Sequence, residues 1–408
     1  MRLQTPKGTS DYIGERAKKL NRIIRAFQDS FELFGFNPIK TPTFEYASIL
    51  KGKYGADEKL IYEFKDKGNR ELALRYDLTV PLARVVGSNQ FALPAKLYSI
   101  GSVFRYDRPQ KGRTREFMQA DIDIIGSTSI SCDVELIACM NNGFNSLGLK
   151  PTFRINNRNL MNQIFEQINI SESKYAEVLR AIDKLDKIGV TSLEKELKSI
   201  GIPTSKLIKI ILIKGNSKSV SSKLNKLDIT IDFSELDSLF EQIYKIQLNP
   251  AKLKIDLSLA RGLDYYTGNV YEIDIGEELS VGGGGRYSRL INDLTGKDLN
   301  GIGISVGITR LLDLVSLTNS DKNELFIISI DSDISKIITE IRKEGITCSY
   351  DLNSRSLNSS LKYADKQDFD NVIIIGKREV SNQKYVLRNM KNGKEENLTL
   401  KQIISKFK

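Results

Sequence analysis

The segment VFRYDRPQKGRTREFMQADIDIIG, at 103–126, carries the densest set of groups able to bind a charged substrate. It reads as two strands joined by a long loop, with Arg105 on the first strand. One face of the second strand carries Gln119, Asp121 and Asp123. The loop between them carries Arg108, Lys111, Arg113 and Arg115. Arginine forks match phosphate bidentately, so this pattern predicts a clamp for a triphosphate and the end of an RNA. A solvated charge run is the alternative, although Arg105 lies within an apolar strand pattern, where an unpaired charge is costly.

A second candidate is ELALRYDLTV, at 71–80. If it is a strand, Arg75, Asp77 and Thr79 share one face. The carboxylate of Asp77 could then pair with a substrate ammonium group, and the hydroxyl of Thr79 could accept a further hydrogen bond. Taken alone, the segment is more typical of a solvated strand face, and the other motifs are what favour a binding site.

The segment LARGLDYYTGNVYEIDI, at 259–275, predicts a turn between two extended runs. Arg261 and Asp264 lie at this turn together with Tyr265 and Tyr266. The cluster offers a fixed positive charge and two phenolic hydroxyl groups. Aromatic pairs more often pack in a core, so the adjacent Arg261 is what favours a binding site.

Two glycine-rich segments follow, GGGGRY at 282–287 and GIGISVGITRLLDLV at 301–315. The first could be a flexible linker, but extended apolar residues precede it and a helical pattern follows, which favours close approach of the backbone to a ligand. In the second, Gly303 and Gly307 clear a strand surface and Arg310 opens a helix. A flat adenine could lie there with Arg310 on a terminal phosphate. The spacing fits neither the Rossmann fingerprint nor a P-loop.

The composition narrows the chemistry that these groups can perform. The 408 residues include 61 Lys and Arg, 51 Asp and Glu, and no histidine. Ser-His triads, histidine-ligated metals and imidazole bases are therefore excluded. The net charge of +10 favours a polyanionic partner. The three cysteines are too scattered for a disulfide framework or a zinc site, so no metal site and a cytoplasmic location are expected. No signal peptide or membrane span is predicted.

The elements that position these groups predict an α+β fold. Residues 16–35 form an amphipathic helix, 35–46 an extended edge segment, and the chain to about 126 alternates as an antiparallel sheet does. Helical patterns occupy 172–228, and sheet patterns return at 252–275, 282–285 and 301–307. A polar connector at 316–323 leads into strand, helix, strand, helix, strand, which is typical of a compact α/β domain.

Taken in order, FRYDRPQKGRTREFMQADIDIIG, LARGLDYYTG, GGGGRY and GIGISVGITRLL resemble the class II aminoacyl-tRNA synthetases, and specifically the histidyl-tRNA synthetase family. The resemblance implies an antiparallel-sheet catalytic domain at 1–171 and 246–318, a helical insertion at 172–245, and an α/β anticodon-binding domain at 323–408. RYDLTVPLAR and RAIDKLDKIGV look like the archaeal and eukaryotic branch of that family.

The resemblance also implies a histidine pocket. Asp77 and Thr79 are expected to hold the α-amino group, and Gln119 the carboxylate or amino region. Asp123 and Tyr266 are expected to read the imidazole, because a carboxylate beside a hydroxyl satisfies one ring donor and one ring acceptor. The remaining pocket members implied are Tyr265, Tyr287 and Gly285.

For the nucleotide, the resemblance implies Arg105 on the α-phosphate and Arg113 and Arg310 on the outer phosphates, with Gly303 and Gly307 also contacting ATP. Arg261 is expected to stabilise the charge that develops during attack, so the implied catalytic set is Arg261, Arg105 and Gln119. The residues implied to contact tRNA are Arg108, Gln110 and Lys111.

The resemblance thus implies an enzyme that uses ATP and Mg²⁺, activates L-histidine, loads tRNA(His) and forms a homodimer. Two alternatives stay open on sequence alone. One is a catalytically inactive relative, such as a regulatory subunit, although such relatives typically lack the C-terminal module. The other is a class II synthetase for another amino acid, such as proline or threonine. The absence of histidine fits drift under a biased genome, selection to be made without the enzyme's own product, or recoding.

Overall fold

The computed structural model describes residues 3–109, 113–246, 248, 252–260, 266–276, 279–316 and 324–407. The chain divides into two compact units, Met1–Val315 and Ser316–Lys408. Within the described residues, no helix is long and apolar enough to cross a membrane.

The first unit is built on a mixed sheet of nine strands, counted over the described residues, in the order β1-β5-β6-β12-β11-β10-β7-β9-β8. The sheet is antiparallel through its centre, while β1 beside β5 and β9 beside β7 run parallel. The strands are β1 (Asn37–Pro38), β5 (Ala95–Phe104), β6 (Glu116–Ile125), β7 (Pro151–Asn157), β8 (Lys214–Gly215), β9 (Leu253–Asp256), β10 (Asn269–Ile275), β11 (Leu279–Arg286) and β12 (Gly301–Gly307).

One face of this sheet is apolar and is covered by helices α1 (Glu15–Leu33) and α4 (Ile130–Ser146), which pack on each other. In α1, Phe27 meets the ring of Phe144 from α4 edge-on, at 5.1 Å between ring centroids. The alternate residues of β6 and β12 that join this core are Ala120, Ile122, Ile124, Ile302, Ile304 and Val306. Because side chains alternate along a strand, the residues between them point to the opposite face.

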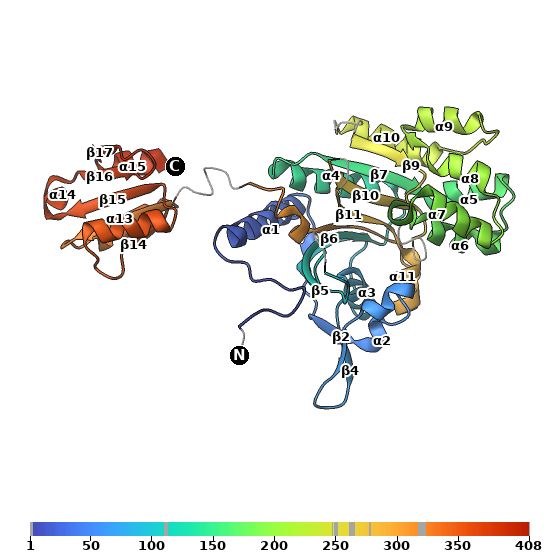
Figure 1. The fold of residues 1–408 in the computed structure, drawn as a ribbon, viewed down its shortest axis with the longest axis horizontal. Helices are drawn as coiled ribbons and strands as arrows, with labels where there is room; N and C mark the ends of the chain where they lie inside the picture. Colours follow the sequence, from blue (N-terminus) through green and yellow to red (C-terminus); the bar gives the residue numbers. More distant parts are fainter. Residues whose placement is uncertain are drawn as a thin grey trace. The chain divides into compact units, whose positions relative to one another are not determined.

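The opposite face is closed at one end by a second core, formed by α2 (Ala47–Leu50), α3 (Thr79–Ser88) and α11 (Ser288–Thr295) with Leu97 of β5. Figure 1 shows α4 above the sheet and α3 and α11 below it. A small sheet in the order β2-β4-β3 lies beside this core. Its strands are β2 (Phe44–Tyr46), β3 (Glu63–Lys65) and β4 (Glu71–Leu74).

The prediction of continuous period-two sheet up to residue 126 is wrong between β2 and β5. That interval also holds α2, α3 and a short 3-10 helix, η1 (Gly55–Leu60). Helix α3 starts at Thr79, directly after the segment read as a strand face. The backbone N–H of Val80 donates to Asp77 Oδ1 at 3.0 Å, so this acid satisfies a free donor of the first helical turn.

Between β7 and β9 the chain is mainly helical, as its sequence pattern predicted. Figure 1 shows these helices, green to yellow, gathered at the β7 and β9 end of the sheet. They are α5 (Arg158–Gln167), η2 (Glu172–Lys174), α6 (Tyr175–Ile182), α7 (Leu185–Ser199), α8 (Thr204–Ile211), α9 (Ser217–Asn225) and α10 (Ser234–Lys245). The short strand β8 from this segment pairs with β9, so the segment also extends the sheet.

A buried charge cluster joins this end of the sheet to the helices. Arg154 of β7 lies 2.8 Å from Asp256, 2.9 Å from Asp274 and within ion-pair distance of Glu272. Asp186 of α7 lies 4.0 Å from the same guanidinium group. Asp256 and Glu272 are almost fully buried, and Arg154, together with Lys214 at 2.9 Å from Asp256, supplies the positive charge that makes their burial tolerable.

The second unit is a compact α/β domain with a five-stranded sheet, counted over the described residues, in the order β14-β13-β15-β16-β17. Its first five elements follow the predicted strand, helix, strand, helix, strand order, and two antiparallel strands complete it. The elements are β13 (Glu324–Ile330), α12 (Ser335–Lys343), β14 (Thr347–Tyr350), α13 (Leu357–Lys366), β15 (Asn371–Gly376), α14 (Lys377–Asn382), β16 (Tyr385–Asn389), β17 (Glu395–Leu398) and α15 (Leu400–Phe407).

Candidate active site

Strand β6 places a row of polar side chains on the face opposite α1 and α4. Gln119, Asp121 and Asp123 alternate with its apolar residues, as the sequence pattern predicted. Across the sheet, Asp121 is paired with Ser305 of β12 and Asp123 with Gly303. The polar row therefore faces a neighbouring strand that carries only small side chains at the same level.

Asp121 and Asp123 of this row, with Gly303 and Ser305 of β12, line a small hollow of about 30 Å³, room for little more than a water molecule, while Gln119 lies outside its lining. Four of the residues predicted for the histidine pocket line it, and they come from α3, β6, the loop before β10 and the end of β11. The lining residues are Thr79, Asp121, Asp123, Tyr266, Gly283, Gly284, Tyr287, Gly303, Ile304 and Ser305.

Glycines form one wall of the hollow because side chains would not fit there. A Cβ atom on Gly303 would collide with Asp123 Oδ1, so this glycine lets the carboxylate lie across β12. A Cβ atom on Gly285 would approach the ring of Tyr266 to 3.0 Å and the backbone oxygen of Asn269 to 2.6 Å. Gly303, predicted to contact ATP, thus lies beside the residues predicted for histidine.

The buried polar row has unused hydrogen-bond acceptors. Over the residues that the structure describes, no partner is found for Gln119 Oε1, Asp121 Oδ2 or Asp123 Oδ2, all of which are buried. The other carboxylate oxygen of Asp123 accepts a hydrogen bond from the hydroxyl of Tyr287. Buried acceptors without partners are costly, so the site is complementary to a ligand rich in N–H donors.

The carboxyl groups here are electrostatically strained. Burial raises the pKa of Asp123 to about 7, against the hydrogen bond from Tyr287. Burial raises the pKa of Asp121 well above its ordinary value, and the charge of Asp123 raises it further. Burial also raises the pKa of Asp77, which Val80 N–H and the charge of Arg105 oppose. A bound cation would relieve this strain, because an opposite charge stabilises the ionised carboxylates.

The structure corrects the predicted strand face at 71–80. Arg75, Asp77 and Thr79 do not alternate along one strand, because β4 ends at Leu74 and α3 begins at Thr79. Arg75 is instead buried against Ser102 O, at 2.7 Å from its Nε. Thr79 nevertheless lines the hollow, and the charge of Asp77 acts on Asp121 and Asp123.

Arg105 is held between two aromatic rings. It follows the last residue of β5 directly, a correction to its predicted place within the strand. Its guanidinium group lies 4.2 Å from the ring centroid of Tyr76 and 5.1 Å from that of Phe117. Over the described residues, only Nε of this group makes a hydrogen bond, to Tyr76 O at 3.1 Å. The arginine is therefore oriented, with its terminal nitrogens available for an anion.

The other two predicted phosphate ligands that the structure describes lie at the same end of the sheet. Arg310 lies in a short 3-10 helix, η4 (Ile308–Leu311), directly after β12, and its side chain passes over Gly307. Gly307 is paired with Gln119 at the start of β6. Arg113, which precedes β6, pairs with Asp107 at 3.0 Å and is 41 % exposed. An exposed pair of this kind is weak, so a phosphate could replace Asp107.

Several predicted residues are not described. Arg261, Tyr265, Gln110 and Lys111 lie outside the described residues. Arg108 is described and exposed, with its backbone N–H donating to Asp107 Oδ1 at 2.8 Å.

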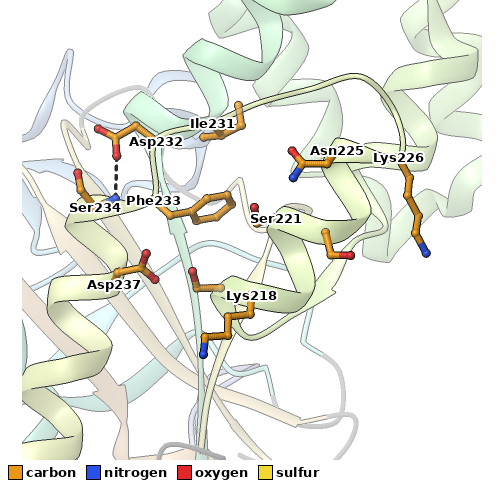
Figure 2. Close-up of a pocket in the computed structure, with 11 residues that line it drawn as sticks. Lys218, Ser221, Asn225, Lys226, Ile231, Asp232, Phe233, Ser234 and Asp237 are labelled. Carbon is orange, nitrogen blue, oxygen red and sulfur yellow. Dashed lines mark hydrogen bonds between the residues drawn. The ribbon is translucent and has the colours of Figure 1, made fainter.

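A much wider hollow, of about 870 Å³, lies on the helical segment between α9 and α10. Figure 2 shows Phe233 between the two helices and Asp232 accepting a hydrogen bond from the backbone of Ser234, at 2.9 Å. Its lining contains Lys218 and Lys226, but no described side chain there has a buried acceptor or donor without a partner. The larger volume therefore does not locate the chemistry, and we place the candidate site at β6.

The comparisons with known proteins identify the family. A family model described as histidyl-tRNA synthetase matches residues 8–311, and one described as an anticodon binding domain matches residues 320–408. The chain belongs to the histidyl-tRNA synthetase family. A histidine–tRNA ligase from Christiangramia forsetii is 36 % identical in an alignment 444 residues long that covers 96 % of this chain and 96 % of the relative. A histidine–tRNA ligase from Clostridium tetani is 38 % identical in an alignment 415 residues long that covers 95 % of this chain and 94 % of the relative.

A solved histidyl-tRNA synthetase, from Nostoc sp. PCC 7120, superposes with a TM-score of 0.87 at 28 % identity, covering 100 % of this chain and 99 % of that one. The predicted fold class is thereby confirmed. The predicted likeness to the archaeal and eukaryotic branch is not supported, because these relatives are bacterial. The proposed division into four domain segments stays a prediction.

Sequence reasoning missed three residues that the structure places in or beside the site. Ser305 joins Gln119 to Asp121, and Tyr76 and Phe117 hold Arg105. The signal for Ser305 was the one polar residue in an otherwise apolar and glycine strand. Its hydrogen-bond partners, Gln119 and Asp121, could be identified only from the pairing register of β6 and β12, which a single sequence does not provide.

Proposed function

We propose that this protein activates L-histidine with ATP and transfers the histidyl group to the 3′ end of tRNA(His). The observation that carries this proposal is the row of buried acceptors on β6. Gln119, Asp121 and Asp123 each keep an acceptor atom without a partner among the described residues. Histidine carries donors at both ends, an ammonium group and a ring N–H, so it fits such a row. Apolar amino acids of similar size are rejected because they leave these acceptors unpaired.

The amino acid lies with its reacting end toward the start of β6. Arg105 and Arg310 follow the ends of β5 and β12 at that edge, so the phosphates of ATP bind there. Asp77 and Thr79 hold the α-amino group together with Gln119. Further along β6, Asp123 faces the ring together with Tyr266, Tyr287 and Gly285.

In the first step, a carboxylate oxygen of histidine attacks the α-phosphorus of ATP. The new P–O bond forms as the bond to the β-phosphate breaks, and pyrophosphate leaves with its electron pair. Arg105 stabilises the charge on the α-phosphate, while Arg113 and Arg310 bind the outer phosphates. Arg261, which lies outside the described residues, is proposed to stabilise the same negative charge on the α-phosphate.

In the second step, a terminal ribose hydroxyl of the tRNA attacks the carbonyl carbon of the adenylate, and AMP leaves. The chain has no histidine, so no imidazole of the protein can take the hydroxyl proton, and we assign it to a phosphate oxygen of the adenylate or to the substrate imidazole. Arg108, with Gln110 and Lys111 in the same loop, is proposed to contact the tRNA. The second unit is proposed to bind the anticodon, on the strength of its family match.

Mg²⁺ is proposed to enter with the phosphates of ATP. The described residues contain no group of three or more acidic or cysteine side chains placed to hold a metal ion. Mg²⁺ commonly binds through substrate phosphates with only one or two carboxylates, so this absence of a cage is compatible with its use. We therefore assign the protein's own contribution to phosphate binding to Arg105, Arg113 and Arg310.

A homodimer is also proposed, from family likeness. One face of the small sheet carries aromatic side chains, with Phe44 51 % and Tyr46 54 % exposed and Phe64 42 % exposed. A second copy could cover this face. Sedimentation equilibrium of wild-type protein and of a Phe44→Glu variant tests it: the wild type is expected to be dimeric and the variant to dissociate more readily.

The activity is tested by ATP–pyrophosphate exchange, run with each of the twenty amino acids. We expect exchange with histidine alone, and charging of tRNA(His) in a second assay. Exchange with proline or threonine in its place would reassign the substrate. No exchange with any amino acid would indicate an inactive relative that keeps only the fold.

A further inference from the structure

Ser305 of β12 joins two polar residues of β6 in a hydrogen-bonded chain. Its hydroxyl lies 2.5 Å from Asp121 Oδ1 and 2.9 Å from Gln119 Nε2. A hydroxyl group has one proton to donate. Ser305 donates to the carboxylate oxygen of Asp121 and accepts from the amide of Gln119. When a substrate ammonium group is bound nearby, Asp121 is ionised and can only accept, which holds the serine proton in this direction.

This chain fixes which way the amide of Gln119 points. Its NH₂ group is committed to Ser305, so its carbonyl oxygen faces away from the serine. That oxygen is buried and has no hydrogen-bond partner among the described residues. Gly101 of β5 and Gly307 of β12 are paired with Gln119 on either side, and the side chains of Arg75 and Arg310 lie over these two glycines.

The substrate group that meets this oxygen follows from the position of Gln119. It lies at the end of β6 nearest to Arg105 and Arg310, where the reacting end of the amino acid has to lie. That end carries a carboxylate and an ammonium group. Only the ammonium donates hydrogen bonds, so a carbonyl acceptor is complementary to it and not to the carboxylate.

We propose that Asp121 is a positioning residue for substrate binding: through Ser305 it orients the carbonyl of Gln119 toward the α-ammonium group of the substrate. The inference rests on the proposed function, because it presumes an amino acid in this hollow. A bound ammonium keeps Asp121 ionised in return, since the added positive charge favours the charged carboxylate.

Removing the acceptor at position 121 should reverse the amide. In an Asp121→Ala variant the serine proton is free to turn to Gln119 Oε1, and the NH₂ group then faces the ammonium. Two donors meet and the hydrogen bond to a charged group is lost, which corresponds to roughly a 10- to 100-fold effect. We expect the KM for histidine in pyrophosphate exchange to rise by about this factor, with kcat changed less and the KM for ATP unchanged.

Conservative and double variants separate positioning from a direct charge effect. Asp121→Asn keeps an acceptor oxygen for Ser305 without the charge, so it is expected to recover most of the lost affinity. Ser305→Ala breaks the chain in the middle, so adding Asp121→Ala to it should cost little more. Ser30→Ala is the matched control, a buried serine of α1 bonded to Cys139 O at 2.8 Å, remote from the hollow.

Ligand analogues give the decisive readout. L-Histidinol keeps the ammonium group, and imidazole-4-propionate lacks it. The relay predicts that Asp121→Ala weakens competitive inhibition by histidinol about 10- to 100-fold and leaves inhibition by imidazole-propionate within about twofold. Equal losses for both analogues would overturn the relay, because Asp121 would then act through packing. Additive single effects, or failure of the asparagine variant to recover affinity, would also overturn it, because Asp121 would then act directly as a charge on the ammonium group.

The two levels of the proposal fail in different ways. If wild-type protein shows no exchange with histidine, the proposed function falls. If wild-type protein is active and Asp121→Ala keeps the wild-type KM, the relay alone falls. Thermal unfolding of each variant checks folding.

Discussion

Replacing Asp123 by asparagine should stabilise the protein and disable its pocket. The carboxyl group is buried, with a pKa raised from 3.8 to about 7, chiefly by burial. A difference of about three pKa units, at 1.36 kcal/mol each, corresponds to a cost on the order of 4 kcal/mol for holding this group ionised. The amide keeps the shape of the side chain and carries no charge.

The sign of the pH dependence follows from proton binding. Between about pH 4 and 7 the folded state holds a proton on Asp123 that the unfolded state has lost. The free energy of unfolding of the wild type therefore falls as pH rises through this window, and the penalty is complete above pH 7. The amide that replaces the carboxyl group in the variant does not titrate, so the two proteins should be similar near pH 4 and diverge toward pH 8.

Thermal unfolding of the full chain, followed by calorimetry from pH 4.5 to 8.5, measures the difference. We expect the Asp123→Asn variant to melt several degrees above the wild type at pH 8, with the gap closing as pH falls. Asp298→Asn, at an exposed position, is the control and should show no such gap. A gap that is independent of pH, or a variant less stable than the wild type at pH 8, would refute the argument. Binding of histidine should be weakened at every pH.

Three further predictions concern neighbouring features. Tyr287→Phe removes the hydrogen-bond donor to Asp123. The KM for histidine in pyrophosphate exchange should rise roughly 10-fold or more, and its pH dependence should shift upward, because the carboxylate loses a bond that favours its ionised form. An unchanged pH profile would contradict this. Arg105→Lys keeps the charge but loses the planar fork, so kcat of exchange should fall at least 10-fold with little change in melting temperature; full activity would show that the phosphate lies elsewhere. Arg154→Met removes the guanidinium group between the buried carboxylates of Asp256 and Glu272 and leaves Lys214, at 2.9 Å, as the cation beside Asp256, which should lower the free energy of unfolding by about 3–5 kcal/mol in urea titration; an unchanged free energy of unfolding would contradict this.

The polar row of β6 could be predicted because its signal is local. Gln119, Asp121 and Asp123 alternate with apolar residues, and a strict alternation of this kind fixes which side chains share a face. The family resemblance supplied the fold class and the second unit in the same way, from motifs that are continuous in the sequence. How the motifs of the first unit lie beside one another came only from the structure.

The failures have physical causes. ELALRYDLTV alternates polar and apolar residues as a strand does. The hydrogen bond from the backbone N–H of Val80 to Asp77 nevertheless stabilises the first turn of helix α3, so the second half of the segment is helical. The cluster around Arg154 could not be seen, since its partners Asp186, Asp256 and Glu272 are far apart in sequence. Each contact depends on strand register or helix placement, which period and composition do not contain.

The absence of side chains along Gly282–Gly285 has an evolutionary consequence. A Cβ atom on Gly284 would collide with the backbone oxygen of Gly303, and one on Gly283 would come within 2.8 Å of Tyr271 O. Any change of residue at these positions adds atoms, so mutation can only narrow this part of the molecule and never widen it. Changes of substrate preference during evolution should therefore occur by substitution of the residues on β6 and α3 that face these glycines. The glycine residues themselves should stay unchanged.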